Sequence, residues 1–157
     1  MKVLIRTASI DDSKDIWSWR NDPDTIKNSN SDNAVGWVDH EVWFERMLAS
    51  SDHEILVGLV INEQDTLQKI GMVRFDSDVD AQYVVCSINL NPNWRGRGLS
   101  GPLLGSAIKS RSLKTEWPIY AEVKPENRAS IKCFEKNMFK LQHRTETVNQ
   151  YILYSNN

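Results

Sequence analysis

Three glycines and two arginines fall within residues 95–101, just before a stretch that has helical character. Glycines carry no side chain, so the backbone amides around them can converge on one point. The following helix adds its own free amides and the positive end of its dipole. Arg95 and Arg97 add full charges, whether their side chains reach the ligand or remain solvated. This segment therefore predicts a binding site for a phosphate or pyrophosphate group.

Two better-known phosphate-binding patterns fit this segment less well. Gly96, Gly98 and Gly101 have the spacing of a dinucleotide-binding fingerprint, and Glu122 follows near the place of its ribose-binding acid. That fold needs consecutive parallel β-α-β units, whereas here the turn follows an antiparallel meander. A P-loop would end in Gly-Lys-Ser or Gly-Lys-Thr, which this turn lacks. The alternative without a binding role is a glycine-rich surface turn with two solvated arginines.

The elements that must position this turn begin with two helices and a meander. In chain order we predict a strand over 2–7, a helix over 11–21, a polar loop over 28–36, a helix over 39–50 that Asp39 caps, and strands over 54–61, 68–75 and 82–90. On the second helix Trp43 and Phe44 share one face with Met47 and Leu48, as a helical period requires. Polar turns between the three later strands favour antiparallel hairpins.

After the turn the pattern changes to one β-α-β unit and two closing strands. In chain order we predict a helix over 101–112, a strand over 118–123, a helix over 127–137, and strands over 141–147 and 150–154. The fold class is therefore α/β, in the mixed α+β sense. We expect a mixed, mostly antiparallel sheet of about seven strands flanked by about four helices. The length suits one domain that spans residues 1–157.

Composition limits the classes of partner. Nineteen basic and 21 acidic residues give a net charge of −2, which argues against a general binder of nucleic acid or of anionic membranes. Cys86 and Cys133 lie in apolar stretches without metal-ligand spacing, so we expect buried free thiols and no metal site. No apolar run has the length of a membrane span, and the first residues are too few for a signal peptide. We expect a cytoplasmic protein.

Two motifs in this order resemble those of the GNAT acetyltransferase superfamily. Residues 95–100 match the signature Arg/Gln-x-x-Gly-x-Gly/Ala, with Ser100 as a small replacement in the last position. About 30 residues later, Ala121-Glu122-Val123-Lys124-Pro125-Glu126-Asn127-Arg128-Ala129-Ser130 and then 133–139 match a second motif of the family. The predicted order of elements extends this resemblance to the whole chain.

The resemblance implies acetyl-CoA as the donor of an acetyl group to an amine. It implies cofactor contacts from Leu90, Arg95, Gly96, Arg97, Gly98, Leu99, Ser100, Asn127 and Phe134. Glu122 matches the glutamate that acts as general base in the ribosomal-protein N-terminal acetyltransferases of the family; a structural glutamate is the alternative. The family usually has a tyrosine as general acid where this chain has Phe134, so the acid is Tyr120, Tyr83, water or absent. Met138 replaces the usual helix-end glycine, and we expect Asn137 to take the left-handed conformation.

The first two helices and the central strands resemble those of GNAT enzymes of surface-polysaccharide biosynthesis, which make pseudaminic and related nonulosonic acids. This implies an amine on a nucleotide-linked amino sugar as acceptor. Arg20, His40 and Arg74 would contact its pyrophosphate, while Trp43 or Trp37 would stack on its base.

Each of these residues also has an ordinary structural role open to it. The aromatic residues could be core, His40 could be a surface or capping residue, and Arg20 could pair with Asp22 or Asp24. The alternatives for the whole protein are an acetyltransferase for protein N-termini and a non-catalytic acyl-CoA-binding domain, which Phe134 favours. The sequence leaves open a homodimer.

Overall fold

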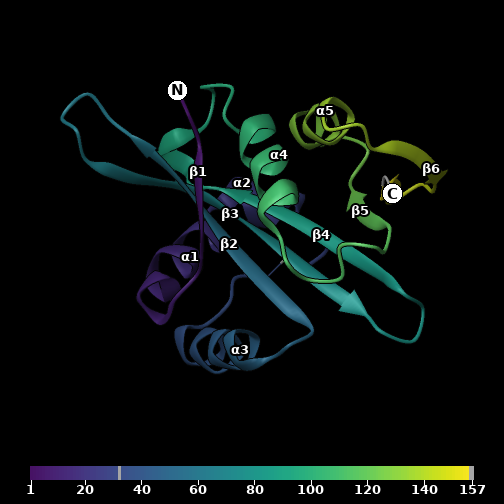
Figure 1. Ribbon diagram of the computed structural model, residues 1–157, viewed down its shortest axis with the longest axis horizontal. Coiled ribbons are helices and arrows are strands. Elements are labelled where there is room, and N and C mark those ends of the chain that lie inside the picture. Colours follow the sequence, from purple (N-terminus) through teal and green to yellow (C-terminus); the bar gives the residue numbers. More distant parts are fainter. Residues whose placement is uncertain (32, 156–157) are drawn as a thin grey trace.

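A twisted sheet of seven strands forms the centre of the computed structural model, which describes residues 1–31 and 33–155 (Figure 1). The strands lie in the order β1-β2-β3-β4-β5-β7-β6. Their bounds are Leu4–Thr7 for β1, His53–Ile61 for β2, Leu67–Asp78 for β3, Tyr83–Leu90 for β4, Ile119–Val123 for β5, Lys140–Arg144 for β6 and Asn149–Leu153 for β7. All neighbouring strands pair antiparallel except β4 and β5, which are parallel.

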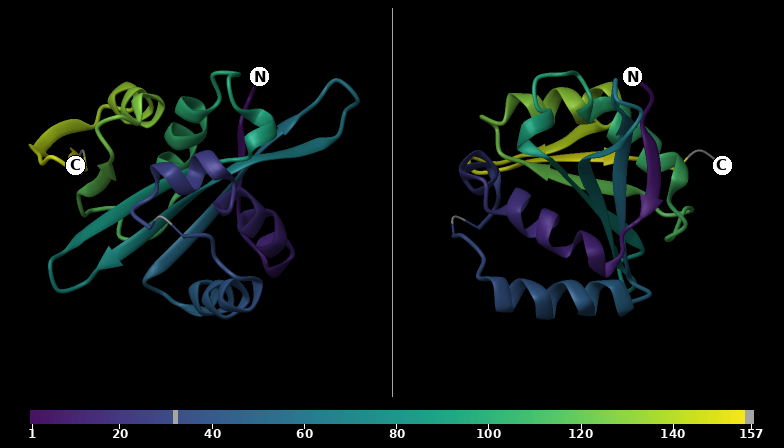
Figure 2. Two further views of the ribbon diagram at one scale, coloured as in Figure 1. Left: turned by 180° about the vertical axis from the view of Figure 1, so that it is seen from behind. Right: turned by 90° about the vertical axis from the view of Figure 1, so that its left-hand side faces the viewer.

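Helices cover both faces of this sheet, as the side view in Figure 2 shows. On one face lie α4 (Ser100–Ser110) and α5 (Arg128–Lys136), and on the other lie α1 (Ser13–Arg20) and α3 (Trp37–Ala49). Two cores result, one with Leu103, Phe134 and Phe75, the other with Trp19 and Phe44. Because β2 and β3 contribute to both cores, β2 is a nearly continuous apolar run, and β3 is buried without a break from Ile70 to Val73.

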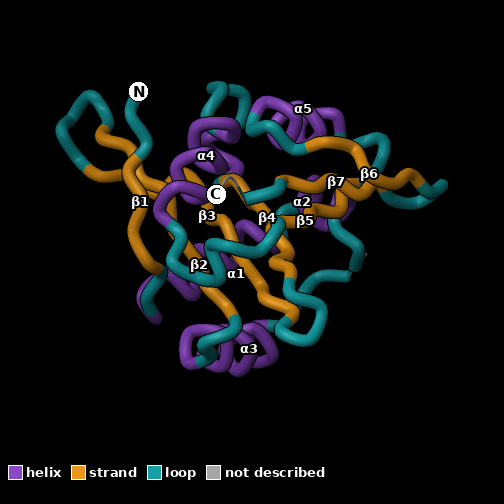
Figure 3. Tube along the Cα trace, turned by 45° about the vertical axis from the view of Figure 1, so that its right-hand side comes forward, coloured by secondary structure: helices purple, strands orange, loops and turns teal. Residues whose placement is uncertain are grey.

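The strands β4 and β5 separate soon after they meet. Their paired residues are Val84 with Ile119 and Val85 with Tyr120. β4 then continues to Leu90 along β3, without β5 at its side. In the tube of Figure 3 the two strands can be followed from this contact. The sheet is therefore split between β4 and β5, along the part of β4 that leads to the glycine-rich turn.

The predicted strands are all present, with ends shifted by a few residues. The helix predicted over 11–21 is divided into a 3-10 turn, Ile10–Asp12, and α1. α3 begins at Trp37 after an N-cap at Gly36, so the expectation that Asp39 caps this helix was wrong. A short helix, α2 (Pro23–Asn28), was not predicted and raises the number of α-helices to five. The loop predicted over 28–36 includes residue 32, which lies outside the described residues.

Candidate active site

The split between β4 and β5 exposes backbone amides of β4. The amide of Asn91 donates to the carbonyl of Ile70 on β3, and the amide of Val84 donates to Pro118 on the opposite side. Amides alternate in direction along a strand, so those of Ile88 and Leu90 point the same way as that of Val84. They lie beyond the last paired residues and project into the split. Leu90 therefore offers a free donor at the end of β4, which could polarise a carbonyl group.

The glycine-rich turn opens space beside this strand end. Gly96 and Gly98 have φ angles of +73° and +71°, a left-handed conformation that favours glycine. A Cβ built on either of them, or on Gly101, would meet nothing within 4 Å. α4 begins at Ser100 directly after the turn, and the first amides of a helix have no partner within it. Open space and unpaired amides at a helix start suit a pyrophosphate group.

Both arginine side chains of the turn have partners within the protein. Arg95 forms an ion pair with Asp22 at 2.8 Å and a hydrogen bond to the Thr25 hydroxyl at 2.8 Å. Arg97 stacks on the ring of Trp94 at 4.4 Å and does not line the cleft described below. In this structure the backbone of the turn is thus the candidate phosphate-binding group. Both guanidinium groups are engaged with other residues.

A cleft of about 900 Å³ joins the turn and the split to α1, α2 and α3. It brings together most of the residues that the sequence predicted for the site: Arg20, Trp43, Arg74, Leu90, Arg95, Gly96, Gly98, Leu99, Ser100, Glu122, Asn127 and Phe134. Arg97 and His40 are outside its lining. Ser87 and Thr25 also line the cleft but were not predicted from the sequence; the Thr25 hydroxyl accepts a hydrogen bond from Arg95.

The start and end of α5 form one wall of the cleft. Asn127 caps α5: its side-chain oxygen accepts from the Ser130 amide at 3.3 Å, while its nitrogen donates to the Ser130 hydroxyl. Phe134 is buried and packs edge-to-face on Phe139, with ring centroids 5.0 Å apart. Its ring therefore replaces a tyrosine hydroxyl with a core contact and has no proton to donate.

Glu122 is exposed on β5 and faces the cleft. Its carboxylate accepts a 3.4 Å hydrogen bond from Asn30. The register places Val85 beside Tyr120, so Ser87 and Glu122, each two residues on, lie at one level on the two sides of the split. A carboxylate and a hydroxyl at this level can bind an amine that enters between the strands.

The two tyrosines proposed as replacement acids lie elsewhere. Tyr83 and Tyr120 pack edge-to-face at 5.0 Å. They line a separate shallow hollow of about 430 Å³ with Gln142, His143 and Gln150. Neither lines the main cleft. Of the alternatives weighed from the sequence, water as the acid and the absence of an acid remain.

Two guanidinium groups share one indole ring on the opposite wall of the cleft. Arg20 and Arg74 each lie 5.3 Å from the ring centroid of Trp43. Arg74 has an ion pair with Asp76 at 2.9 Å, and Asp76 also contacts His53. Arg20 has no ion pair among the described residues, and burial together with the charge of Arg74 lowers its pKa. Asp22 and Asp24, weighed as its partners, bind Arg95 instead. Among the described residues no ion pair neutralises Arg20, which therefore adds positive charge to this wall of the cleft.

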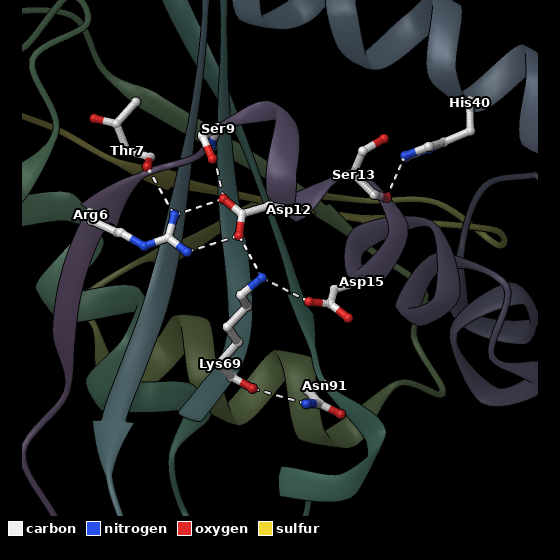
Figure 4. Close-up of polar contacts among 9 residues, drawn as sticks. All are labelled: Arg6, Thr7, Ser9, Asp12, Ser13, Asp15, His40, Lys69 and Asn91. Atoms are coloured by element: carbon white, nitrogen blue, oxygen red, sulfur yellow. Dashed lines mark hydrogen bonds and ion pairs between the residues drawn. The ribbon is translucent and has the colours of Figure 1, made fainter. Parts of the chain in front are cut away.

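His40 does not reach the cleft, so the expectation that it binds the acceptor was wrong. It is fully buried, and its Nε2 lies 2.8 Å from the Ser13 carbonyl, as Figure 4 shows. Its ring stacks on Phe44 and on Trp37, so Trp37 is also engaged in a contact within the protein. Burial lowers the pKa of His40, because a charged imidazole would lose its hydration. The side chain is a neutral link between α1 and α3.

A buried carboxylate fixes the end of β4 from the other side of the sheet. Asp12 accepts two hydrogen bonds from Arg6, at 2.7 and 2.9 Å, and one from the Ser9 amide, and it forms an ion pair with Lys69 at 2.8 Å (Figure 4). The carbonyl of Lys69 accepts from the Asn91 side chain at 2.9 Å. Asn91 directly follows Leu90, so this network holds the strand end that presents the free amide.

The cleft contains no ionised thiol. Cys133 and Cys86 both line it and are buried. Burial raises the pKa of Cys133 to about 11 and that of Cys86 further, so neither is a thiolate near neutral pH. Among the described residues, no group of three or more metal-binding side chains is placed to hold an ion. Nor does any helix there combine the length and apolarity that crossing a bilayer demands.

The sequence matches the acetyltransferase (GNAT) domain family over residues 2–140. The chain belongs to the GNAT family. It is an N-acetyltransferase. A comparison with curated proteins finds no match for this GNAT chain.

Solved structures share the whole fold with this GNAT enzyme at low sequence identity. Spermidine N-acetyltransferase from Vibrio cholerae, in complex with CoA and spermine, has a TM-score of 0.82 and 16% identity, with 98% of this chain and 96% of that one covered. AAC(6')-Ib in complex with ribostamycin and coenzyme A has a TM-score of 0.78 and 16% identity, with coverages of 99% and 94%. The protein yncA from Salmonella typhimurium, with its cofactor acetyl-CoA, has a TM-score of 0.79 and 19% identity, with coverages of 100% and 96%. These similarities establish the fold.

Proposed function

We propose that this enzyme transfers the acetyl group of acetyl-CoA to the amine of a nucleotide-linked amino sugar, as a cytoplasmic step of surface-polysaccharide biosynthesis. The observation that carries the proposal is the pair of guanidinium groups, Arg20 and Arg74, on the Trp43 ring in the cleft. Arginine is suited to bidentate hydrogen bonding with phosphate oxygens. A nucleotide sugar brings a pyrophosphate that would neutralise this wall.

The same charges disfavour polycationic acceptors. The related structures contain spermine in one case and an aminoglycoside, ribostamycin, in another. In this chain a polyamine would place its ammonium groups near Arg20, which has no acidic partner among the described residues. Like charges in a partly buried site repel more strongly than in water. We therefore expect selection for an acceptor that carries an anionic group.

The chemistry that the cleft residues support is direct transfer. Glu122 removes a proton from the acceptor ammonium, directly or through water, and the neutral amine attacks the thioester carbonyl. The Leu90 amide stabilises the oxygen of that carbonyl as charge develops. The C–S bond then breaks, the acetylated nitrogen loses its remaining extra proton to water, and CoA leaves as a thiolate that takes up a proton from water. A thiol pKa of about 8.5 makes this a tolerable leaving group without an acid at Phe134.

A panel assay for released CoA tests the acceptor. The enzyme is offered acetyl-CoA with 4-amino nucleotide sugars, with N-terminal peptides of ribosomal proteins, and with polyamines. We expect turnover with the nucleotide sugars, and loss of it in Arg20→Ala and Arg74→Ala with little change in the KM for acetyl-CoA. Gly98→Glu serves as the donor control, because its carboxylate would enter the space of the pyrophosphate.

Other outcomes of the panel would contradict the proposal in different ways. Turnover with peptides alone would identify an acetyltransferase for protein N-termini. Tight binding of acetyl-CoA without turnover of any acceptor would favour an acyl-CoA-binding role, for which the core position of Phe134 is the specific observation.

A further inference from the structure

The short helix α2 contributes residues to the lining of the cleft and is attached on both sides of the split. On the side of β4, Arg95 bonds Asp22 and Thr25, and the Thr25 hydroxyl is 3.4 Å from the Asn89 side chain. On the side of β5, Lys124 donates to the carbonyl of Lys27 at 2.9 Å. The view from behind in Figure 2 shows α2 in front of the sheet between these segments. α2 is thus a strap over the site.

Asp22 is the residue that joins this strap to the donor site. Its carboxylate accepts from the amides of Asp24 and Thr25 and so caps α2. The same carboxylate holds Arg95, which begins the glycine-rich turn. Burial would raise the pKa of Asp22, but the hydrogen bond from Arg95 and the amides of α2 lower it. The contact is therefore a charged pair near neutral pH.

The pyrophosphate of acetyl-CoA would compete for this arginine. The unpaired amides of residues 96–101 direct its charge to the turn that Arg95 begins. The Arg95 side chain is about one-third exposed, at 32%. Partly exposed ion pairs of this kind are weak enough to exchange. A phosphate group can hold arginine through two parallel hydrogen bonds, and so can replace Asp22.

We propose that Asp22 is a positioning residue that holds α2 over the cleft through Arg95, and that acetyl-CoA releases α2 by drawing Arg95 to its pyrophosphate. Donor binding then loosens the strap on the side from which the acceptor enters. The donor would bind before the acceptor for this reason. The inference rests on acetyl-CoA as donor and is independent of the acceptor proposed above.

Calorimetric titration with CoA tests the first half. Asp22→Asn keeps the capping ability of the side chain, since asparagine caps helices as well as aspartate does, but removes its charge. We expect this variant to bind CoA roughly two- to fivefold more tightly than the wild type at low salt, the range of a weak ion pair. The matched control is Asp24→Asn, because Asp24 is 80% exposed and 3.6 Å from Arg95. The gain in CoA affinity of Asp24→Asn should be less than about half the gain of Asp22→Asn. Equal or weaker binding by Asp22→Asn, or an equal gain in both variants, would overturn the proposal.

Hydrogen exchange of the wild-type protein tests the second half without any substitution. Addition of CoA should speed exchange of the α2 amides, while α3 serves as an unchanged reference. In Asp22→Asn these amides should exchange faster before CoA is added and change little afterwards. Slower or unchanged exchange of α2 in the wild type on CoA binding would refute release of the strap. Neither measurement needs an acceptor, so a failure of the sugar panel is distinguishable from a failure here.

Discussion

Glu122 presents an exposed carboxylate to the cleft, and its hydrogen bond from Asn30 is long, at 3.4 Å. A base in this position has to remove a proton from an ammonium group, and that need disappears as the pH rises and the amine loses its proton to water. We expect Glu122→Gln to lower kcat/KM about 10²-fold near neutral pH, and by much less at high pH. Rate profiles of both forms across pH measure this.

A matched variant separates the role of Glu122 as base from its charge. Glu126→Gln makes the same change four residues further on, at an exposed side chain outside the cleft lining. It should leave the profile unchanged. A ratio of wild-type to Glu122→Gln rates that is constant over the whole pH range would argue against a base and for a structural glutamate.

The placement of some single residues in the site could be predicted from the sequence, and that of others could not. The places of Glu122 on a strand and of Leu90 at a strand end were predictable because strand and turn signals are local, whereas their roles in the site were implied by the family resemblance. The prediction for His40 was wrong because its burial depends on the packing of α3 against α1, and its polar contact among the described residues is with the distant Ser13. The partner of Arg95 was likewise unpredictable, because Asp22 is far away in the chain and only the fold brings them together.

At the scale of elements, the turn that ends α5 explains why a phenylalanine is present at position 134. The amide of Phe139 donates to the Phe134 carbonyl and that of Met138 to Glu135, which is the pattern of a Schellman motif. The two phenylalanine rings supply the apolar contact that accompanies it. Met138, with φ of +70°, takes the left-handed position, so the expectation that Asn137 does so was wrong. Asn137 instead donates to the carbonyls of Cys133 and Gly101, which ties α5 to α4.

A glycine at this helix end should stabilise the protein. Met138 is 65% exposed, so little burial is lost with its side chain. Relief of the left-handed strain is partly offset by the greater freedom of glycine in the unfolded chain, which leaves a gain of about 0.5–1 kcal/mol. Denaturant unfolding of Met138→Gly measures it. Met138→Ala retains Cβ and should show no gain; if both variants are equally stable, strain at this position is not the cause.

α2 was the element that the sequence analysis lacked, and a signal for it was present. Asp22 followed by Pro23 is a capping residue before a proline at the first helical position. The polar composition of the following segment outweighed it, because a short helix with no buried residue shows no apolar period. By contrast, the strands of the meander were predictable, since their apolar runs are long and their turns polar.

At the scale of the whole molecule, the split sheet follows from how the strands are connected. The meander ends in β4, and the crossover through α4 returns a parallel strand that pairs with it only at Val84 and Val85. The order of elements was sufficient to predict the mixed sheet. The order of elements could not predict the extent of the split, because the split depends on how α4 and α5 pack against strands that are distant in the sequence.

The whole fold also depends on pH through the Asp12 network, which joins β1, α1 and β3. Burial would raise the pKa of Asp12, but the hydrogen bonds from Arg6 and Lys69 outweigh it and hold the pKa far below its ordinary value. A lowered pKa stabilises the folded state above the unfolded value of about 3.9, and this stabilisation is lost as the pH falls below it. His40, whose pKa is also lowered, adds a separate loss that begins below about pH 6.5, where the unfolded chain takes up a proton.

We therefore expect Asp12→Asn to lower the free energy of unfolding by about 2–3 kcal/mol near neutral pH, because it leaves two cations without their buried partner. Below about pH 4 the difference from the wild type should shrink, since the wild-type carboxylate loses its advantage there. Urea unfolding at several pH values measures both effects. Asp15→Asn is the control, because Asp15 binds the same Lys69 from a side chain that is 52% exposed, and such pairs contribute less than about 1 kcal/mol. A difference between Asp12→Asn and the wild type that stays constant down to low pH would show that packing, and not charge, gives Asp12 its role in the fold.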